Sequence, residues 1–155
     1  MSVRFTLDTS AIEEMLRDAA GDLQEAIRPA AQAGAQVLVD EVQRNVNRIG
    51  KKTGNLRRSI YQVFSRRSSS NERAVYHVSW NAQKAPHGHL IEFGHFQRYR
   101  VIVDKRTGKW VTLKNRPIAP RQVGARPFLR PAAARMPQAL DAAQAVLFER
   151  MKGFR

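Results

Sequence analysis

The spacing of apolar residues changes at Gly50, and this change constrains the fold more than any other feature of the sequence. Between Ile12 and Ile49, apolar residues recur at the three- and four-residue spacing of an amphipathic helix. Beyond Gly50, several short segments alternate apolar and polar residues, as half-buried strands do. The chain has 155 residues, the size of one domain. We therefore predict a single α+β domain, residues 1–155, with helices first and an antiparallel sheet after them.

Capping and breaking residues mark the ends of the predicted helices. Ser10 and Glu13 have the spacing of a capping box, which predicts a helix start. Pro29 lacks a backbone donor, so we expect a first helix to end near Arg28 and a long second helix to begin with Pro29. Gly50 is the expected stop of the long helix.

The alternating segments predict an antiparallel sheet of about four strands, arranged as two hairpins with basic tips. The expected strands, which follow a short one at residues 3–7, are residues 60–64, 74–80, 99–103 and 110–113. The second hairpin lies within residues 96–118. Together with the helices, these segments give a sheet that is covered on one face.

Prolines and a final amphipathic pattern describe the end of the chain. The prolines from Pro117 to Pro131 predict an extended, turn-rich stretch. Apolar residues from Met136 to Met151 then return to helical spacing, so residues 132–155 are assigned to a C-terminal helix. Pro137 is expected to break or kink the beginning of that helix.

The charge is strongly positive and unevenly distributed. Against 13 Asp and Glu stand 27 Lys and Arg, for a net charge of +14, yet residues 1–41 hold only three basic residues and eight acidic ones. This segregation suggests one face turned toward a polyanion and another turned toward protein, although a solvated surface is the plainer interpretation. The basic residues predicted to face DNA or a partner are Lys51, Lys52, Arg57, Arg58, Arg66, Arg67, Lys105, Arg106 and Lys109.

Residues capable of metal or thiol chemistry are sparse. The chain has no cysteine, which excludes disulfides, thiolate zinc sites and cysteine nucleophiles. His87, His89 and His95 cluster around Glu92, but no two of the histidines have the four-residue spacing of a helical zinc site. We predict no metal and no cofactor, and expect Glu92 to be a partly buried carboxylate paired with an arginine or with backbone donors.

Known nucleotide- and nucleic-acid-binding motifs are missing. Lys-Thr-Gly at residues 52–54 lacks the upstream glycine of a phosphate-binding loop, and no helix-turn-helix or RNA-binding strand motif is visible. The charge therefore favours salt-dependent attraction to a nucleic-acid backbone over reading of bases. Since no long apolar run or secretory signal occurs, we expect a soluble protein that contacts no membrane and stays in the cytoplasm where it is made.

Three segments in order resemble a known family. They are Lys-Thr-Gly-Asn-Leu-Arg-Arg-Ser-Ile at residues 52–60, His-Leu-Ile-Glu-Phe-Gly at residues 89–94 and Ala-Arg-Pro-Phe-Leu-Arg-Pro-Ala at residues 125–132. With a long helix before them and a helix after, they resemble the tail-completion and minor tail proteins of long-tailed bacteriophages. That family includes lambda minor tail protein Z and head-tail joining components. The chain departs from the family pattern at His95, at residues 87–89 and in the longer segment 96–118.

The resemblance implies a structural protein of the virion without catalytic activity. Such a protein assembles as a homo-oligomeric ring, expected to be a hexamer, at the neck or the tail end. There it joins the tail tube protein to head-closure or connector proteins while DNA passes through. The residues that the resemblance marks as critical for fold and assembly are Thr53, Gly54, Leu56, Ser59, Glu92, Phe93, Gly94, Pro127, Phe128 and Pro131.

Two other classes of protein fit the composition. Small basic ribonucleases of the toxin type also combine helices, an antiparallel sheet and many basic residues. Here the residues available for such an activity are His77, Glu92, His95 and Arg126. A non-specific DNA-binding protein is the other alternative, with an affinity that falls steeply as salt is raised.

Overall fold

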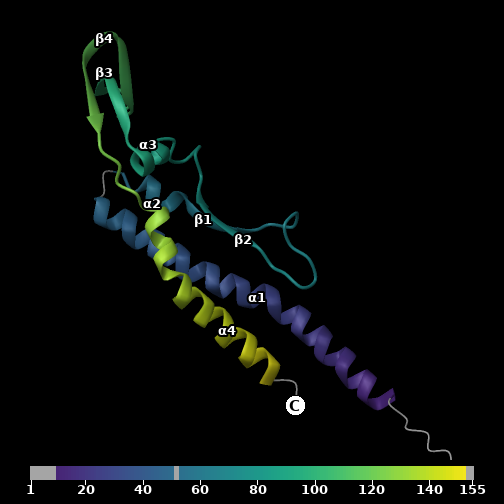
Figure 1. Ribbon diagram of the computed structural model, residues 1–155. Helices are drawn as coiled ribbons and strands as arrows, with labels where there is room; N and C mark the ends of the chain where they lie inside the picture. The colour runs from purple at the N-terminus through teal and green to yellow at the C-terminus, as the bar shows by residue number, and fades with distance from the viewer. Residues whose placement is uncertain (1–9, 51–52, 153–155) are drawn as a thin grey trace, which may run out of the picture. The chain divides into compact units, whose positions relative to one another are not determined.

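The computed structural model describes residues 10–50 and 53–152, with side chains from Arg17 onward. The strand expected at residues 3–7 lies outside this range. In chain order the elements are α1 (Ser10–Ile49), α2 (Asn55–Ser59), β1 (Ile60–Phe64), β2 (Tyr76–Trp80), α3 (Gly88–Phe93), β3 (His95–Val103), β4 (Trp110–Val123), the 3-10 helix η1 (Arg130–Arg135) and α4 (Met136–Lys152) (Figure 1). This order confirms the predicted α+β class with a long N-terminal helix and a C-terminal helix.

The chain divides into two compact units. Unit 1 comprises the described parts of Met1–Glu41, Tyr61–Ser79 and Ala133–Arg155, and unit 2 comprises those of Val42–Ile60 and Trp80–Ala132. The first part of α1 therefore belongs to unit 1, and its last turns belong to unit 2.

Helix α1 is one continuous helix of 40 residues, so the predicted break at Pro29 is wrong. Proline costs about 3 kcal/mol inside a helix, because it removes a backbone donor and clashes with the preceding turn. The buried side chains of Ala26 and Ala30 lie on either side of Pro29, and the buried apolar face continues to Val46. Packing of this face outweighs the local penalty. The predicted end is confirmed, since Gly50 follows α1 with a φ of 103° that favours glycine.

In unit 1, α4 runs antiparallel along α1, as Figure 1 also shows. Near the start of α4, Arg135 Nε lies 3.2 Å from the Glu41 carboxylate. One turn further on, a Cβ placed on Gly34 would come within 2.8 Å of the Ala139 carbonyl oxygen. The small residue at position 34 therefore permits a close approach of the two helix backbones.

The four predicted strands are present, but they form two separate two-stranded sheets rather than one sheet. β1 and β2 form a hairpin in which the Phe64 and Tyr76 rings lie 5.5 Å apart, and the Arg28 guanidinium of α1 lies over the Phe64 ring. The segment after β2 forms turns and α3, and β3 then pairs only with β4. The alternation of apolar residues predicts strands but does not determine which strands pair.

The second hairpin is longer than predicted, because β3 and β4 are paired from His95 opposite Val123 to Val103 opposite Trp110. Pro117 and Pro120, expected in a turn-rich stretch, lie within β4. Pro117 is opposite Tyr99, where the register shifts. Each strand of a two-stranded sheet has a free edge, so a residue without a backbone donor is tolerated there, particularly at a bulge.

The predicted closing helix is present as α4. Pro137 does not break it, because Pro137 is its second residue and a proline in the first turn of a helix forfeits no intrahelical hydrogen bond. The helix geometry changes just before this position, from the 3-10 helix η1 to α4. None of the helices in the described ranges is long and apolar enough to span a bilayer.

Candidate functional site

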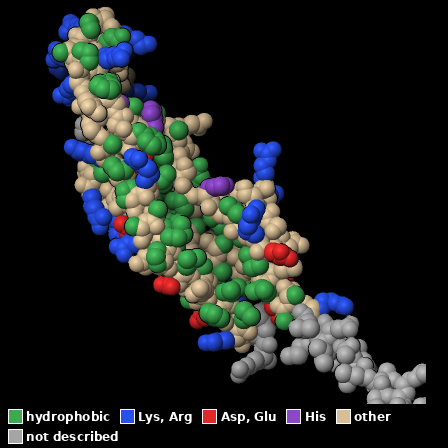
Figure 2. Space-filling view, in the orientation of Figure 1, with side chains coloured by type: hydrophobic (Ala, Val, Ile, Leu, Met, Phe, Trp, Pro, Cys, Tyr) green, Lys and Arg blue, Asp and Glu red, His purple; other side chains and the backbone are tan. Residues whose placement is uncertain are grey.

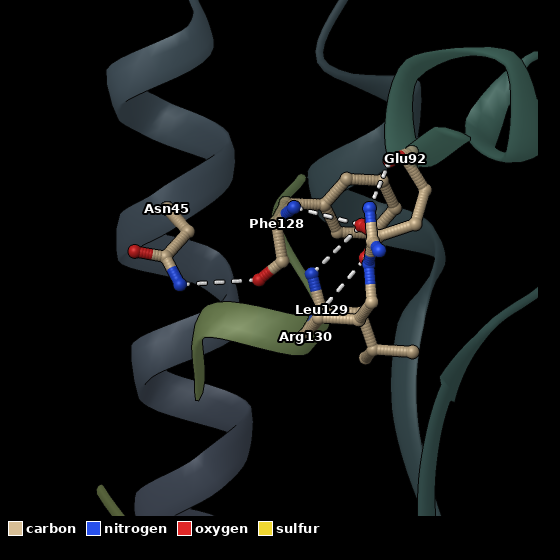
Figure 3. A network of polar contacts seen from close by, with 5 residues as sticks. All are labelled: Asn45, Glu92, Phe128, Leu129 and Arg130. Carbon is tan, nitrogen blue, oxygen red and sulfur yellow. Dashed lines mark hydrogen bonds and ion pairs between the residues drawn. The ribbon is translucent and has the colours of Figure 1, made fainter. Parts of the chain in front are cut away.

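Glu92, the central residue of the second family motif, is buried in unit 2 and accepts hydrogen bonds from the third motif. Only 1% of Glu92 is exposed. Its Oε2 accepts hydrogen bonds from the backbone N–H groups of Phe128 (2.7 Å) and Leu129 (3.0 Å). Its Oε1 accepts from the backbone N–H and from the Nε–H of Arg130, both at 3.1 Å (Figure 3). Together with Asn45, these residues form what we call the Glu92 network.

The four donors keep Glu92 ionised. Burial alone would raise the pKa of the Glu92 carboxyl. The backbone N–H groups of Leu129, Phe128 and Arg130, with the Arg130 side chain, outweigh burial and lower this pKa below its ordinary value of 4.5. The carboxylate therefore acts as a fixed acceptor for three consecutive backbone donors, as the expected pairing with arginine and backbone groups predicted.

Glycine and proline explain why the chain bends into this arrangement. Gly94 ends α3 with a φ of 73°, and a Cβ there would come within 2.7 Å of the Val123 carbonyl oxygen. The Arg126 backbone N–H donates to the Ile91 carbonyl at 2.8 Å, which places the following loop against α3. Pro127 has no N–H group, so the run of donors to Glu92 begins at Phe128.

Phe128 is the apolar centre of the same site. The side chain is fully buried, and its ring meets the Trp80 ring edge-on at a centroid distance of 5.5 Å. The Asn45 Nδ2–H of α1 donates to the Phe128 carbonyl at 3.1 Å (Figure 3). A Cβ on Gly88 would overlap the Trp80 ring. Residues from α1, β2, α3 and the loop before η1 therefore hold the third motif in place.

The first motif forms the turn and short helix α2 that lead into β1. Gly54 has a φ of 74°, and Leu56 and Ser59 are buried. The Ser59 hydroxyl donates to the Leu56 carbonyl at 2.6 Å. The Ser59 carbonyl accepts from the Asn81 N–H at 2.8 Å, next to Trp80. This motif therefore stabilises the same unit as the Glu92 network.

The remaining predicted residues are mostly on the surface. Thr53, Pro127 and Pro131 are exposed, and so is Phe93, whose ring lies 5.1 Å from the Arg130 guanidinium. Lys51 and Lys52 lie outside the described residues. The other predicted basic residues are all exposed, with two in unit 1 and the rest in unit 2; they are Arg57, Arg58, Arg66, Arg67, Lys105, Arg106 and Lys109.

The residues considered for ribonuclease activity do not form a proton-transfer site around Glu92. The Glu92 carboxylate has its hydrogen-bonding positions occupied and a lowered pKa, which suits neither a general acid nor a poised general base. His95 Nδ1 is buried without a hydrogen-bond partner, and His77 is exposed in unit 1. Among the side chains that the structure describes, from Arg17 to Lys152 without residues 51–52, no three His, Asp or Glu converge as a metal site would require.

Four residues that support the site are not among the residues predicted as critical for fold and assembly, although Arg130 lies within the third family segment: Asn45, Trp80, Gly88 and Arg130. One feature of the sequence indicates Asn45: it is a polar residue within the apolar spacing of the long helix. The pairing of Trp80 with Phe128 spans 48 positions of sequence, and no local pattern indicates it.

Comparison with protein families identifies the chain. Residues 10–94, more than half of the 155, match the family described as "Bacteriophage HK97-gp10, putative tail-component". The match covers the first two motifs and ends at Gly94, so the third motif and the β3–β4 hairpin lie beyond it. No match was found among curated proteins or among solved structures. The protein therefore belongs to the HK97-gp10-like family of bacteriophage tail components.

Proposed function

We propose that the protein is a ring-forming tail-completion or head-tail joining subunit without catalytic activity. In this proposal it sits at the neck or tail end of the virion. It ends the tail tube and connects it to head-closure proteins while DNA passes through. The whole chain, residues 1–155, acts as one tail-completion domain, with residues 96–118 as an inserted hairpin and residues 132–155 as its C-terminal helix. Family membership supports the tail role, and an exposed apolar helix face supports the assembly.

The observation that carries the assembly is the outer face of α4. Large apolar side chains recur along one side of this helix and are about half exposed: Met136, Leu140, Phe148 and Met151. The adjoining, Ala-rich side packs on α1 through Ala139 and Ala143. Half-exposed large apolar side chains along one side of a helix, in a chain of +14 net charge, are typical of a surface that another protein covers. We infer that it is covered by a second copy, because the virion component of this proposal is a homo-oligomeric ring.

In the same proposal, the exposed basic residues contact DNA or an acidic neighbouring protein. A ring through which DNA passes, or which docks on an acidic neighbour, places positive charge where its partner is negative. The exposed basic residues of α2 and of the hairpin turns are the candidates for this role.

Electron microscopy and native mass spectrometry test the proposal. The purified wild-type protein is expected to form closed hexameric rings and to cap isolated tail tubes in negative stain. Leu140→Glu should weaken the ring by placing a charge in the apolar contact. Gln138→Glu is the matched control, because residue 138 is exposed on another side of α4. A wild-type protein that stays monomeric and never caps tubes would contradict the proposal.

A further inference from the structure

The β3–β4 hairpin in unit 2 has no core of its own. Every residue from Arg98 to Val103 is exposed, and so are Lys109 to Thr112 on the facing strand. Successive side chains of a strand point to opposite faces, so neither face of this part of the hairpin is covered. A two-stranded hairpin is at best marginally stable alone in water. The hairpin therefore needs a partner surface.

The side chains of the hairpin describe what that partner must offer. Phe96 is 65% exposed, and Ile102, Val103 and Val111 line a shallow apolar depression next to the turn. Figure 2 shows Lys and Arg side chains gathered on the hairpin. The basic side chains of the two strands and the turn are Arg98, Arg100, Lys105, Arg106, Lys109, Lys114, Arg116 and Arg121. The partner must be both apolar and acidic.

The one acidic residue of the hairpin does not neutralise this charge. Asp104 accepts hydrogen bonds from the Arg106 backbone N–H (2.9 Å) and from the Thr107 hydroxyl (2.8 Å) within its own turn. These two hydrogen bonds stabilise the turn, and the basic side chains around Asp104 can contact a partner.

Protein fits this surface better than DNA does. Protein–DNA interfaces are more polar than protein interfaces, and phosphate contacts are made by donors and cations. The aliphatic side chains of Val101, Ile102, Val103 and Val111 offer neither, and their exposure is typical of a protein contact.

A second copy of this chain carries a matching surface. On α1, Asp18, Asp22 and Glu25 are spaced four and three residues apart and so share one side of the helix, and residues 18–27 contain no basic residue. Leu23, which follows Asp22 in the sequence, projects from an adjoining side of α1 and is 39% exposed. We propose that the β3–β4 hairpin of one copy docks on the acidic stripe Asp18–Asp22–Glu25 of the next copy.

This contact is head-to-tail, because it joins two different surfaces, and a head-to-tail contact generates a ring when the rotation between neighbouring copies closes. It also offsets the repulsion expected between chains that each carry +14. The inference rests on the proposed ring, and it names a contact between copies in addition to the apolar face of α4.

Charge reversal on each side, followed by mixing, tests the contact. The hairpin variant is Arg98→Glu with Arg100→Glu, and the helix variant is Asp18→Lys with Asp22→Lys. Alone, each variant sets like charges against each other, and its half-assembly concentration should rise on the order of tenfold or more. Mixed in equal amounts, the two variants should recover assembly as rings of alternating subunits, as seen by native mass spectrometry. Misfolded variants could not recover in this way.

The matched control is Lys84→Glu with Arg126→Glu, which makes the same charge change at two exposed residues of the same unit that lie outside the proposed contact, and which should leave assembly unchanged. Because the chain lacks cysteine, Arg100→Cys in one copy and Asp22→Cys in another should form a single disulfide between copies.

If the wild type forms rings but the mixed variants do not recover assembly and no disulfide forms, the proposed docking contact is contradicted, whereas the proposed ring is still supported. If the hairpin variant loses only DNA binding, the hairpin serves DNA and the inference falls. If the wild type never assembles, both fail.

Discussion

The Glu92 carboxylate accepts backbone hydrogen bonds of the kind that a neighbouring strand or helix turn usually accepts. The backbone N–H groups of Phe128, Leu129 and Arg130 follow one another where the loop enters η1, and all three donate to the Glu92 carboxylate. A buried carboxylate with two oxygens meets all three and also pairs with the Arg130 guanidinium. The second and third family motifs are therefore joined in one hydrogen-bonded network. Its chemistry is that of a buried acceptor held in place.

Removing this acceptor should destabilise the protein strongly. Glu92→Ala leaves three backbone donors and a guanidinium without their carboxylate, and we expect a loss of about 3–5 kcal/mol in the free energy of unfolding. Glu92→Gln keeps one acceptor oxygen and should cost less. Urea denaturation followed by circular dichroism measures both, with the exposed Glu149→Gln as control. A Glu92→Ala protein within about 0.5 kcal/mol of the wild type would contradict the role given to Glu92.

The same network predicts the dependence of stability on pH. The pKa of Glu92 is lowered in the folded state, so its contribution is fully present above the ordinary carboxyl value of 4.5. It is lost as the pH falls through the lower folded-state pKa. The stability difference between wild type and Glu92→Gln should therefore shrink between pH 5 and pH 3, measured as urea midpoints at each pH. A difference that stays constant or grows over this range would be inconsistent with a lowered pKa.

At the scale of elements, local patterns predicted the boundaries of helices and strands better than their connections. Ser10 and Gly50 correctly bound α1, and β1 lies where alternation placed it. The helix break predicted at Pro29 was wrong, because the local penalty of the proline is outweighed by packing of the buried face that includes Ala26 and Ala30. The split into two sheets depends on contacts distant in sequence, such as Trp80 with Phe128, which periodicity cannot show.

The Pro29 penalty can be measured. Pro29→Ala restores a backbone donor inside α1 and removes the steric clash, so it should stabilise the protein by roughly 1–3 kcal/mol. Pro137→Ala, in the first turn of α4, restores no intrahelical bond and should change stability by less than about 0.5 kcal/mol. Thermal unfolding compares the two variants. A destabilised Pro29→Ala protein would show that the proline contributes packing that outweighs its cost.

At the scale of the whole molecule, the motif residues were predicted from the sequence, but the exposed apolar surfaces of α4 and of the β3–β4 hairpin were not. Glu92, Gly94 and Phe128 were identified by resemblance, and the structure brings them together. The apolar side of α4 was visible as helical spacing, but spacing alone does not say which apolar residues are buried and which face outward. Two such surfaces, on α4 and on the β3–β4 hairpin, are exposed in the single chain. They fit a subunit made to be covered by its neighbours.

The mass of the assembled wild-type protein tests this account most directly. Native mass spectrometry near physiological salt should show one dominant species at six times the chain mass of 17.6 kDa. Diluting the sample should release monomers without a ladder of open intermediates, since a closed ring loses two contacts when its first subunit leaves. A monomer that persists at every protein concentration, or an open-ended series of masses, would contradict a ring-forming tail-completion subunit.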